Sequence, residues 1–387
     1  MSVRPFGLRP PPNVNVALSR LQINHVRNLQ RVSLDGLQQV NVFFGRNGSG
    51  KTSVLESIHL LGMARSFRGN SIRSVITHQK TDCTVFGMVT PSSSSSTVVG
   101  AGLPLGVQRN MAGEVQIKVS GKAVRTVAQL VEHFPLQVIT ADSFDLLTGS
   151  PGARRQFLDW GVFHVEHRFF SQWQRFQRCI KQRNKLLRRD KIADQELHVW
   201  TRDLAASGKA INDYRKAYFE LLKPRVAVIM GRLAPSLVAL ELRFRQGWDK
   251  QLSYEEALDN SASADLEHGY THVGPQRADI RVISDGHLAA ETLSRGQQKL
   301  VVCALKLAQG QLMSEMGKGK CTYLIDDLPS ELDQQHSQLV CALLASMDAQ
   351  VFITCVHQQD IEAVWPETKE LAMFHVEHGA VQRYSPL

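Results

Sequence analysis

A run of eight residues, 45–52, has the composition and order of a loop that holds phosphate groups. Two glycines flank four residues and precede a lysine and a threonine: Gly45, Arg46, Asn47, Gly48, Ser49, Gly50, Lys51 and Thr52. In such a loop the glycines let backbone N–H groups close around a phosphate where side chains would collide. The lysine bridges the β- and γ-phosphates, and the threonine hydroxyl binds Mg²⁺. The spacing therefore predicts a site for a nucleoside triphosphate.

The residues on either side of this loop supply the elements that must position it. The apolar run 40–44 predicts a buried strand, and after the loop apolar residues recur at helical spacing, at Val54, Leu55, Ile58 and Leu61. The N-terminus of that helix adds partial positive charge at the phosphate. Strand, loop and helix thus follow one another in the order that a phosphate site requires.

A second segment, residues 322–327, is an apolar run that ends in two carboxylates, Asp326 and Asp327. A strand of this kind opposite a phosphate loop is typical of Mg²⁺-nucleotide sites. We expect Asp326 to hold Mg²⁺ together with Thr52, and Asp327 to orient or deprotonate the attacking water. The long separation between Lys51 and Asp326 predicts an inserted domain.

The segment 293–298, Leu-Ser-Arg-Gly-Gln-Gln, precedes a predicted helix at 296–311. Alone it indicates only a helix start with Ser294 as N-cap. Ahead of a strand that ends in carboxylates, it matches the LS-x-GQ signature of ABC-type ATPases. In that arrangement Ser294, Gly296 and Gln297 contact the γ-phosphate of a nucleotide held by a second copy of the chain.

Positive charge is concentrated between residues 151 and 235. This stretch holds 18 Lys and Arg against 8 Asp and Glu, whereas the rest of the chain holds 27 against 28. Its apolar residues follow a helical stripe and predict two or three long helices. This excess of positive charge favours binding to DNA phosphates. The alternative is that these Lys and Arg side chains only cover a helix surface that faces water. Candidate DNA contacts are Lys181, Arg183, Lys185, Arg188 and Arg189, with Arg65 and Arg68 in a separate basic loop.

Six scattered cysteines without a C-x-x-C pair favour free thiols in a reducing compartment. No run approaches the roughly 18 continuous apolar residues of a membrane span. The N-terminus lacks the apolar core of a secretion signal. We therefore expect a cytoplasmic protein without a membrane partner.

Four motifs in order resemble the RecF family of bacterial recombinational repair ATPases, which is related to the SMC and Rad50 proteins: GRNGSGKT, SPGARRQFLDWGVFHVEH, LSRGQQK and LIDDLPSELD. The resemblance runs from about Leu18 to the C-terminus. It implies an α/β fold, namely an ABC-type ATPase head (a P-loop NTPase) with an inserted, mainly helical second lobe. We expect a flexible tail at 1–16, the head at 17–147 and 266–387, and the basic helical lobe at 148–265.

The same resemblance implies ATP and Mg²⁺ as cofactors and an ATP-dependent homodimer on single-stranded, double-stranded or gapped DNA. The ATPase would be weak, DNA-stimulated and used as a switch. It implies a role in DNA repair, replication restart and the SOS response to DNA damage, in cooperation with RecO and RecR at gaps or single-strand/double-strand junctions. Gln137 would be the glutamine that contacts Mg²⁺ and the attacking water. Cys355 stands where ABC ATPases carry a switch histidine, with His357 two residues further on.

Two other classes share part of this pattern. The ATPase subunit of an ABC transporter has the same loop, signature and carboxylates, but it needs a small lobe with an apolar groove rather than a large basic insert. A simple kinase would use the loop alone, and the LSRGQQ segment has no role there. The basic insert therefore favours a DNA-binding ATPase.

Overall fold

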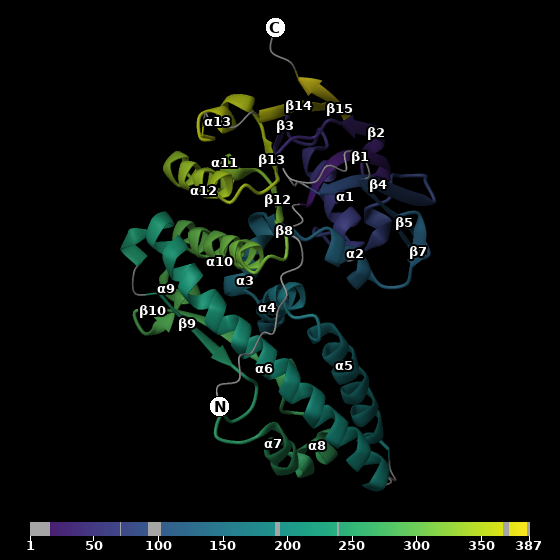
Figure 1. Ribbon diagram of the computed structural model, residues 1–387, viewed down its shortest axis with the longest axis vertical. Coiled ribbons are helices and arrows are strands. Elements are labelled where there is room, and N and C mark those ends of the chain that lie inside the picture. The colour runs from purple at the N-terminus through teal and green to yellow at the C-terminus, as the bar shows by residue number, and fades with distance from the viewer. Residues whose placement is uncertain are drawn as a thin grey trace. The chain divides into compact units, whose positions relative to one another are not determined.

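The computed structural model describes residues 16–69, 71–91, 102–189, 194–237, 240–366 and 371–384. The chain forms two compact units, which we call the head unit (residues up to 143, with 305 onwards) and the helical unit (144–304). Figure 1 labels their elements. Apart from Val16, the predicted tail at 1–16 lies outside the described residues, as does the serine run 92–96.

The head unit contains an antiparallel six-stranded sheet in the order β2-β1-β4-β5-β6-β7. Buried and exposed residues alternate along much of β2, so that Val32 and Leu34 face the core. The strands are β1 (Val16–Val26), β2 (Leu29–Asp35), β4 (Asp82–Pro91), β5 (Leu103–Asn110), β6 (Val115–Val119) and β7 (Lys122–Val124).

A second six-stranded sheet of the head unit has the order β15-β14-β3-β13-β12-β8. Five of its strands are parallel and β15 is an antiparallel edge. Every residue of β12 and β13 is buried, as expected for parallel strands covered on both faces. The strands are β3 (Val40–Phe44), β8 (Leu136–Ile139), β12 (Thr322–Ile325), β13 (Val351–Cys355), β14 (Leu371–Glu377) and β15 (Ala380–Tyr384).

Helix α1 (Lys51–Met63) contacts strands of both sheets and is buried along nearly its whole length. Val54, Leu55 and Ile58 belong to the core that the sheets share. This burial fixes the N-terminus of α1 at the carboxyl end of β3. The other helices of this unit are α2 (Val127–His133), α11 (Leu328–Glu331), α12 (Gln334–Ser346), α13 (Gln358–Glu362) and the C-terminal part of α10 (Arg295–Glu315).

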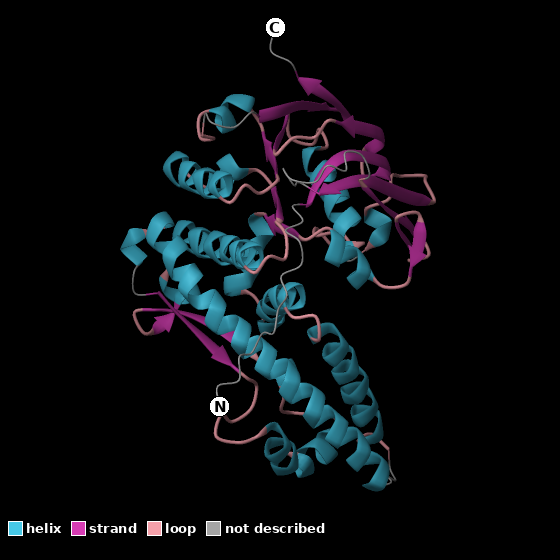
Figure 2. Ribbon diagram, in the orientation of Figure 1, coloured by secondary structure: helices cyan, strands magenta, loops and turns pink. Residues whose placement is uncertain are grey.

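The helical unit is mainly α-helical, as the sequence predicts (Figure 2). Two long helices, α5 (Phe169–Leu186) and α6 (Asp194–Leu233), pack along each other. The shorter helices are α3 (Asp145–Thr148), α4 (Pro151–Val165), α7 (Tyr254–Asn260), α8 (Ala262–His268) and α9 (Ala289–Thr292). A small sheet orders its strands β11-β10-β9: β9 (Leu240–Arg245), β10 (Asp279–Ser284) and β11 (His287–Leu288).

The division between the units differs from the expected one. The first boundary falls at 143/144 rather than 147/148, and the second at 304/305 rather than after 265. The physical reason is the pairing of β9 with β10, which joins Arg245 to Asp279 across the expected boundary. The ladder keeps β10, and the start of α10 with it, in the helical unit.

Several predicted elements lie where the sequence pattern placed them, including the strand 40–44 and the apolar run before Asp326 and Asp327. The predicted helix at 296–311 corresponds to α10. Within the described residues no helix is both long enough and apolar enough to span a bilayer.

Candidate functional site

The loop between β3 and α1 is closed by backbone that only glycine tolerates. Gly45 has φ +148°, and a Cβ there would lie 2.2 Å from the carbonyl oxygen of Val376. Gly50 has φ +120°, and a Cβ there would lie 2.9 Å from the Asn28 amide nitrogen. That amide donates to the carbonyl oxygen of Ser49 at 2.9 Å. The turn between β1 and β2 is thus hydrogen-bonded to the phosphate loop, a contact that the sequence pattern did not reveal.

Lys51 begins α1 and folds back over this loop. Its Nζ donates to the carbonyl oxygens of Gly45 at 2.6 Å and Arg46 at 3.1 Å, and the residue is 8% exposed. Burial lowers the pKa of the Lys51 ammonium, an effect that the carboxylate of Asp327 opposes. A buried cation held only by two carbonyl oxygens is well placed to exchange them for phosphate oxygens.

The two carboxylates that follow β12 lie opposite this loop. The Thr52 hydroxyl donates to the two carboxylate oxygens of Asp326 at 3.0 and 3.1 Å. Thr354, at the end of β13, donates to Asp326 Oδ1 at 2.7 Å and accepts from the Asp327 N–H at 2.8 Å. Burial raises the pKa of Asp326, which the hydrogen bonds from Thr354 and Thr52 partly counteract.

These oxygen atoms fit a magnesium ion. Mg²⁺ prefers one or two carboxylates together with hydroxyl, water and phosphate oxygens. The Thr52 hydroxyl already lies within hydrogen-bond distance of both Asp326 oxygens, and a cation there would offset the cost of burying that carboxylate. Thr52 and Asp326, the predicted pair, are therefore brought together by the fold.

Thr354 is a site residue that the sequence analysis missed. We expect Thr354→Val to reduce ATP turnover at least about 10-fold, because a hydrogen bond to a charged group is worth about 1.5–3 kcal/mol. Thr354→Ser keeps the hydroxyl and should retain most of the turnover. Steady-state ATPase assays at several Mg²⁺ concentrations test this, and equal rates for Thr354→Val and wild type would refute the assigned role.

A pocket of about 1000 Å³ surrounds these groups. Besides Lys51, Thr52 and both aspartates, it is lined by a basic rim that includes Arg27, Arg68 and Arg73. All of these residues belong to the head unit.

The basic loop after α1 belongs to this pocket. Glu56 is fully buried, accepts two hydrogen bonds from Arg27 at 2.8 Å and lies 3.9 Å from Arg68. Arg68 is exposed and lines the pocket of the phosphate loop, and its role as a DNA contact stays a prediction. Arg65 is exposed and stays a candidate DNA contact.

Gln137 does not lie at the carboxylates. It pairs in β8 with Tyr323, three positions before Asp326, and it is 6% exposed. Its amide donates to the Gln309 side chain at 2.9 Å, and the described lining of the pocket does not include it. The interpretation of Gln137 as the glutamine at Mg²⁺ is therefore withdrawn. His357 is exposed at the N-cap of α13 and is likewise outside that lining.

The predicted signature lies in the helical unit, at the N-terminus of α10. Ser294 and Gln297 form a reciprocal cap: the Ser294 N–H donates to Gln297 Oε1 at 2.9 Å, and the Gln297 N–H donates to Ser294 Oγ at 3.3 Å. Ser294 and Gly296 are exposed, and a Cβ at Gly296 would meet nothing within 4 Å. The helix-start interpretation is thus correct, and the same cap leaves an open surface at a helix N-terminus.

The candidate basic residues of α5 and of the turn that follows it divide into two kinds. Lys181, Lys185, Arg188 and Arg189 are exposed. Arg183 is not: its guanidinium donates to Asp265 at 2.6 Å and to Thr271 at 2.7 Å, and both charged side chains are at most 3% exposed. The prediction of Arg183 as a DNA contact is wrong, because this arginine ties α5 to α8 inside the unit.

We expect Arg183→Ala to lower the free energy of unfolding by about 3 kcal/mol, since it removes the guanidinium from the buried Asp265 carboxylate and leaves only the weaker pairing with His272. Lys181→Ala, on the exposed side of the same helix, should change it by less than about 0.5 kcal/mol. Urea unfolding followed by circular dichroism measures both. Equal stability of the two variants would contradict the structural role.

Comparison with known proteins identifies the family. A family described as the RecF/RecN/SMC N terminal domain matches residues 17–382. The chain is 49% identical to the DNA replication and repair protein RecF of Stutzerimonas stutzeri over 95% of its length and 97% of that relative. It is 48% identical to the protein of the same name from Pseudomonas aeruginosa, over 95% of its length and 98% of that relative.

Solved structures agree in fold. One described as the recombination mediator protein RecF with ATP in the RecFOR pathway has a TM-score of 0.83 at 23% identity, covering 96% of this chain and all of that one. An Smc head bound to the C-winged helix domain of ScpA has a TM-score of 0.57 at 12% identity, covering 95% and 96%. These matches give the fold as the ABC-type ATPase head of RecF and SMC proteins. From the family match and these relatives, the chain belongs to the RecF family.

Proposed function

We propose that this chain binds ATP with Mg²⁺ in the pocket of the head unit. The observation that carries the proposal is the convergence of Lys51, Thr52 and Asp326 on one side of the glycine loop. Ser49 Oγ is buried in that loop without a hydrogen-bond partner among the described residues, as expected of a group that awaits a ligand oxygen. The relative of known structure is described with ATP, which supports the same ligand here.

The residues take separate roles in this proposal. Backbone N–H groups of 45–50 and the Lys51 ammonium hold the β- and γ-phosphates, and Thr52 with Asp326 holds Mg²⁺. When bound, Mg²⁺ neutralises charge that develops on the transferred phosphoryl group. Asp327 lines the pocket beside Asp326 and is placed to orient or deprotonate the attacking water.

Turnover on this proposal requires two copies of the chain. Ser294, Gly296 and Gln297 present an exposed helix N-terminus that suits the γ-phosphate on a partner copy. ATP thus closes a homodimer and weak hydrolysis opens it again, so that the ATPase acts as a switch.

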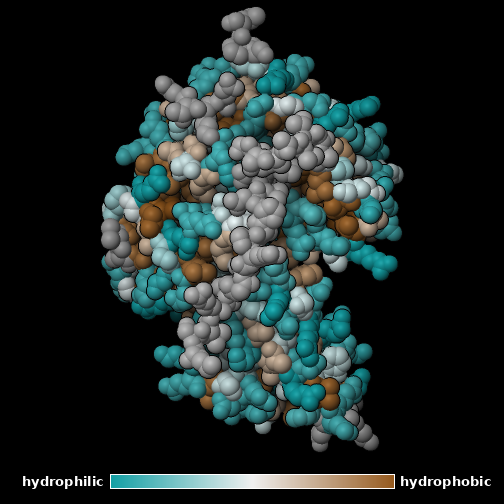
Figure 3. All heavy atoms as spheres, in the orientation of Figure 1, coloured by the Kyte–Doolittle hydropathy of each residue, from teal (hydrophilic) through white to brown (hydrophobic). Residues whose placement is uncertain are grey.

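The closed dimer clamps DNA, with Lys181, Lys185, Arg188, Arg189 and Arg65 as candidate phosphate contacts. The visible surface over α7, α8 and the adjoining ends of α5 and α6 is mainly hydrophilic (Figure 3). The names of the relatives support a role in DNA replication and repair, and the RecFOR pathway supports RecO and RecR as partners at gapped or junction DNA in the cytoplasm. The relatives are RecF and SMC proteins, so the transporter alternative is not favoured.

Separate substitutions of the two aspartates test the proposal. We expect Asp327→Asn to bind ATP and Mg²⁺ normally but to hydrolyse at least about 100-fold more slowly, since a positioned general base contributes about 10²–10⁴-fold. Its ATP-dependent dimers on DNA should therefore outlast those of the wild type. Asp326→Asn should instead raise the Mg²⁺ concentration required for tight ATP binding.

The measurements are ATP turnover, Mg²⁺-dependent binding of a fluorescent ATP analogue, and the lifetime of the protein–DNA complex after dilution. Identical behaviour of the two variants in all three would show that the division of roles is wrong.

A further inference from the structure

A second pocket, of about 880 Å³, lies within the helical unit and has no part in the ATP site. Strands β9 and β10, the loop 246–250 and the single-turn helix η4 (Pro275–Arg277) form its walls, together with α6 at one side. Five Lys and Arg side chains line it against two aspartates: Lys216, Arg245, Lys250, Arg277 and Arg281 against Asp249 and Asp279.

The two loops of this pocket are held together through glycine backbone. Gly247 has φ +96°, and a Cβ there would lie 2.2 Å from the carbonyl oxygen of Gly274. The Gly274 N–H donates to the Gly247 carbonyl oxygen at 3.2 Å. A larger residue at position 247 would break both contacts. The loop 246–250 and the segment around Gly274 are therefore held in a fixed arrangement.

A buried arginine anchors η4 from beneath. Arg215 is 3% exposed, donates to the Pro275 carbonyl oxygen at 2.7 Å and forms an ion pair with Asp159 at 2.7 Å. Arg155 also donates to the Ala278 carbonyl oxygen at 2.9 Å. These contacts set the position from which Arg277 projects, so its guanidinium is presented by a rigid support.

The positive charge of this pocket is not cancelled internally. Asp279 is already paired with Arg154, at 2.7 Å. Arg245, Arg277 and Arg281 are exposed, and no described carboxylate forms an ion pair with them. Arg277 lies 5.9 Å from the ring centroid of Tyr270, which orients it without neutralising it. The pocket thus offers three free guanidinium groups, the side chain that recognises phosphate bidentately.

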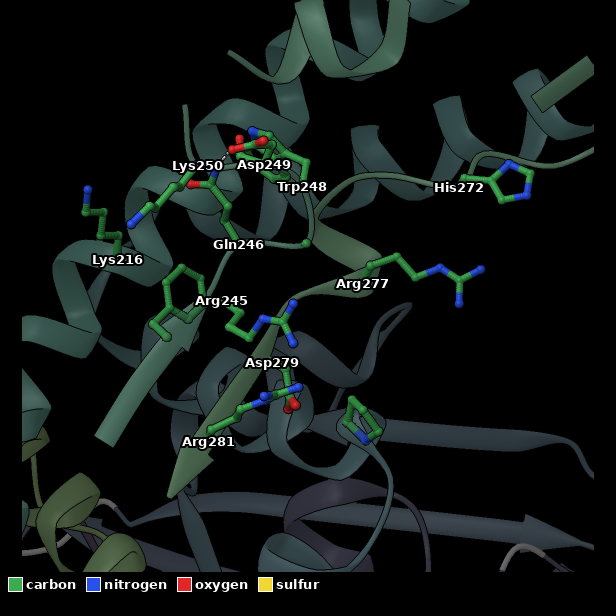
Figure 4. Close-up of a pocket in the computed structure, with 13 residues that line it drawn as sticks. Lys216, Arg245, Gln246, Trp248, Asp249, Lys250, His272, Arg277, Asp279 and Arg281 are labelled. Atoms are coloured by element: carbon green, nitrogen blue, oxygen red, sulfur yellow. Dashed lines mark hydrogen bonds between the residues drawn. The ribbon is translucent and has the colours of Figure 1, made fainter. Parts of the chain in front are cut away.

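We infer that this pocket binds consecutive phosphate groups of a nucleic acid strand. Figure 4 shows the cations spread along it: Lys216 and Lys250 at one side, Arg277 at the other, and Arg245 and Arg281 between them. A small anion needs donors that converge on one point, whereas a strand of regularly spaced phosphates needs donors in a row. The inference deepens the DNA binding proposed above and rests on it.

The test is the double substitution Arg245→Gln with Arg281→Gln. The matched control is Arg243→Gln with Lys223→Gln, which removes the same charge from exposed side chains outside the pocket in the same unit. Fluorescence anisotropy with a labelled oligothymidylate and a labelled duplex, titrated with NaCl with and without ATP, measures affinity and its salt dependence. Thermal melts and binding of a fluorescent ATP analogue confirm that each variant is intact.

We expect the pocket variant to lower DNA affinity at least about 10-fold and to reduce the slope of log K against log salt by about 1–2, since each lost phosphate contact removes about 0.9. The control should stay near the wild type. Arg277→Gln alone, which tests the other wall, should reduce the slope by about 1.

A pocket variant that binds both DNAs with the affinity and salt slope of the control overturns the inference while the proposed function stands. A wild-type protein that binds neither DNA, with or without ATP, overturns the proposed function as well.

Discussion

Lys51→Ala is expected to weaken ATP binding at least about 100-fold, because two charge-assisted contacts to phosphate are worth about 3 kcal/mol or more. Lys51 is the buried cation that folds over the loop carbonyls of Gly45 and Arg46, whereas Arg27, Arg68 and Arg73 lie on the rim of the pocket. Equilibrium binding of a fluorescent ATP analogue in the presence of Mg²⁺ measures the effect.

Two controls define what this result means. Lys51→Arg should keep more of the affinity but lose turnover, because a planar guanidinium does not reproduce a compact ammonium between two phosphates. Lys209→Ala, which removes an exposed lysine paired only with Asp213, should leave binding unchanged. Unaltered nucleotide affinity in Lys51→Ala would contradict the assignment of the phosphate loop.

We expect Ser294→Arg to keep ATP binding but to lose the steps that depend on bound ATP. The exposed Ser294 and Gly296 surface would receive a long cation where two copies must close on a phosphate. Monomeric ATP binding should survive, whereas ATP-dependent dimerisation, hydrolysis and stable DNA binding should fail together. Hydrolysis should fall at least about 100-fold, in line with the loss of a preorganised oxyanion-type contact.

The loss of a helix cap must be distinguished from the loss of the signature. Ser294 caps α10, and replacing such a cap costs about 1 kcal/mol. Ser253→Ala removes the equivalent cap of α7 in the same unit and should leave dimerisation intact. Mixing Ser294→Arg with Lys51→Ala gives heterodimers with one intact composite site, and partial ATPase in the mixture would support the two-copy arrangement.

Sequence reasoning was most successful where a pattern is local. The phosphate loop, the buried strand 322–325 and the helix 296–311 each follow from short-range apolar patterns and glycine placement. Pairing across long distances was not available from that pattern. The ladder between β9 and β10 moved the boundary of the inserted unit, and the register of β8 moved Gln137 away from the carboxylates.

The sequence pattern also did not show which polar residues are buried. Arg183 and its neighbours on α5 have the same charge in sequence, and only the position of Asp265, far along the chain, shows that Arg183 is internal. Thr354 has no motif of its own, and its role follows from the alignment of β13 beside β12. Both residues depend on contacts between segments that periodicity does not connect.

In the proposed mechanism, ATP joins two copies of this chain through the Ser294 surface. Sedimentation velocity of the wild type and of Ser294→Arg, each with Mg²⁺ and with or without ATP, tests it most directly. We expect an ATP-dependent shift from monomer to dimer for the wild type, and a monomer under all conditions for Ser294→Arg with its ATP affinity preserved. Normal ATP-dependent dimerisation of Ser294→Arg would contradict it.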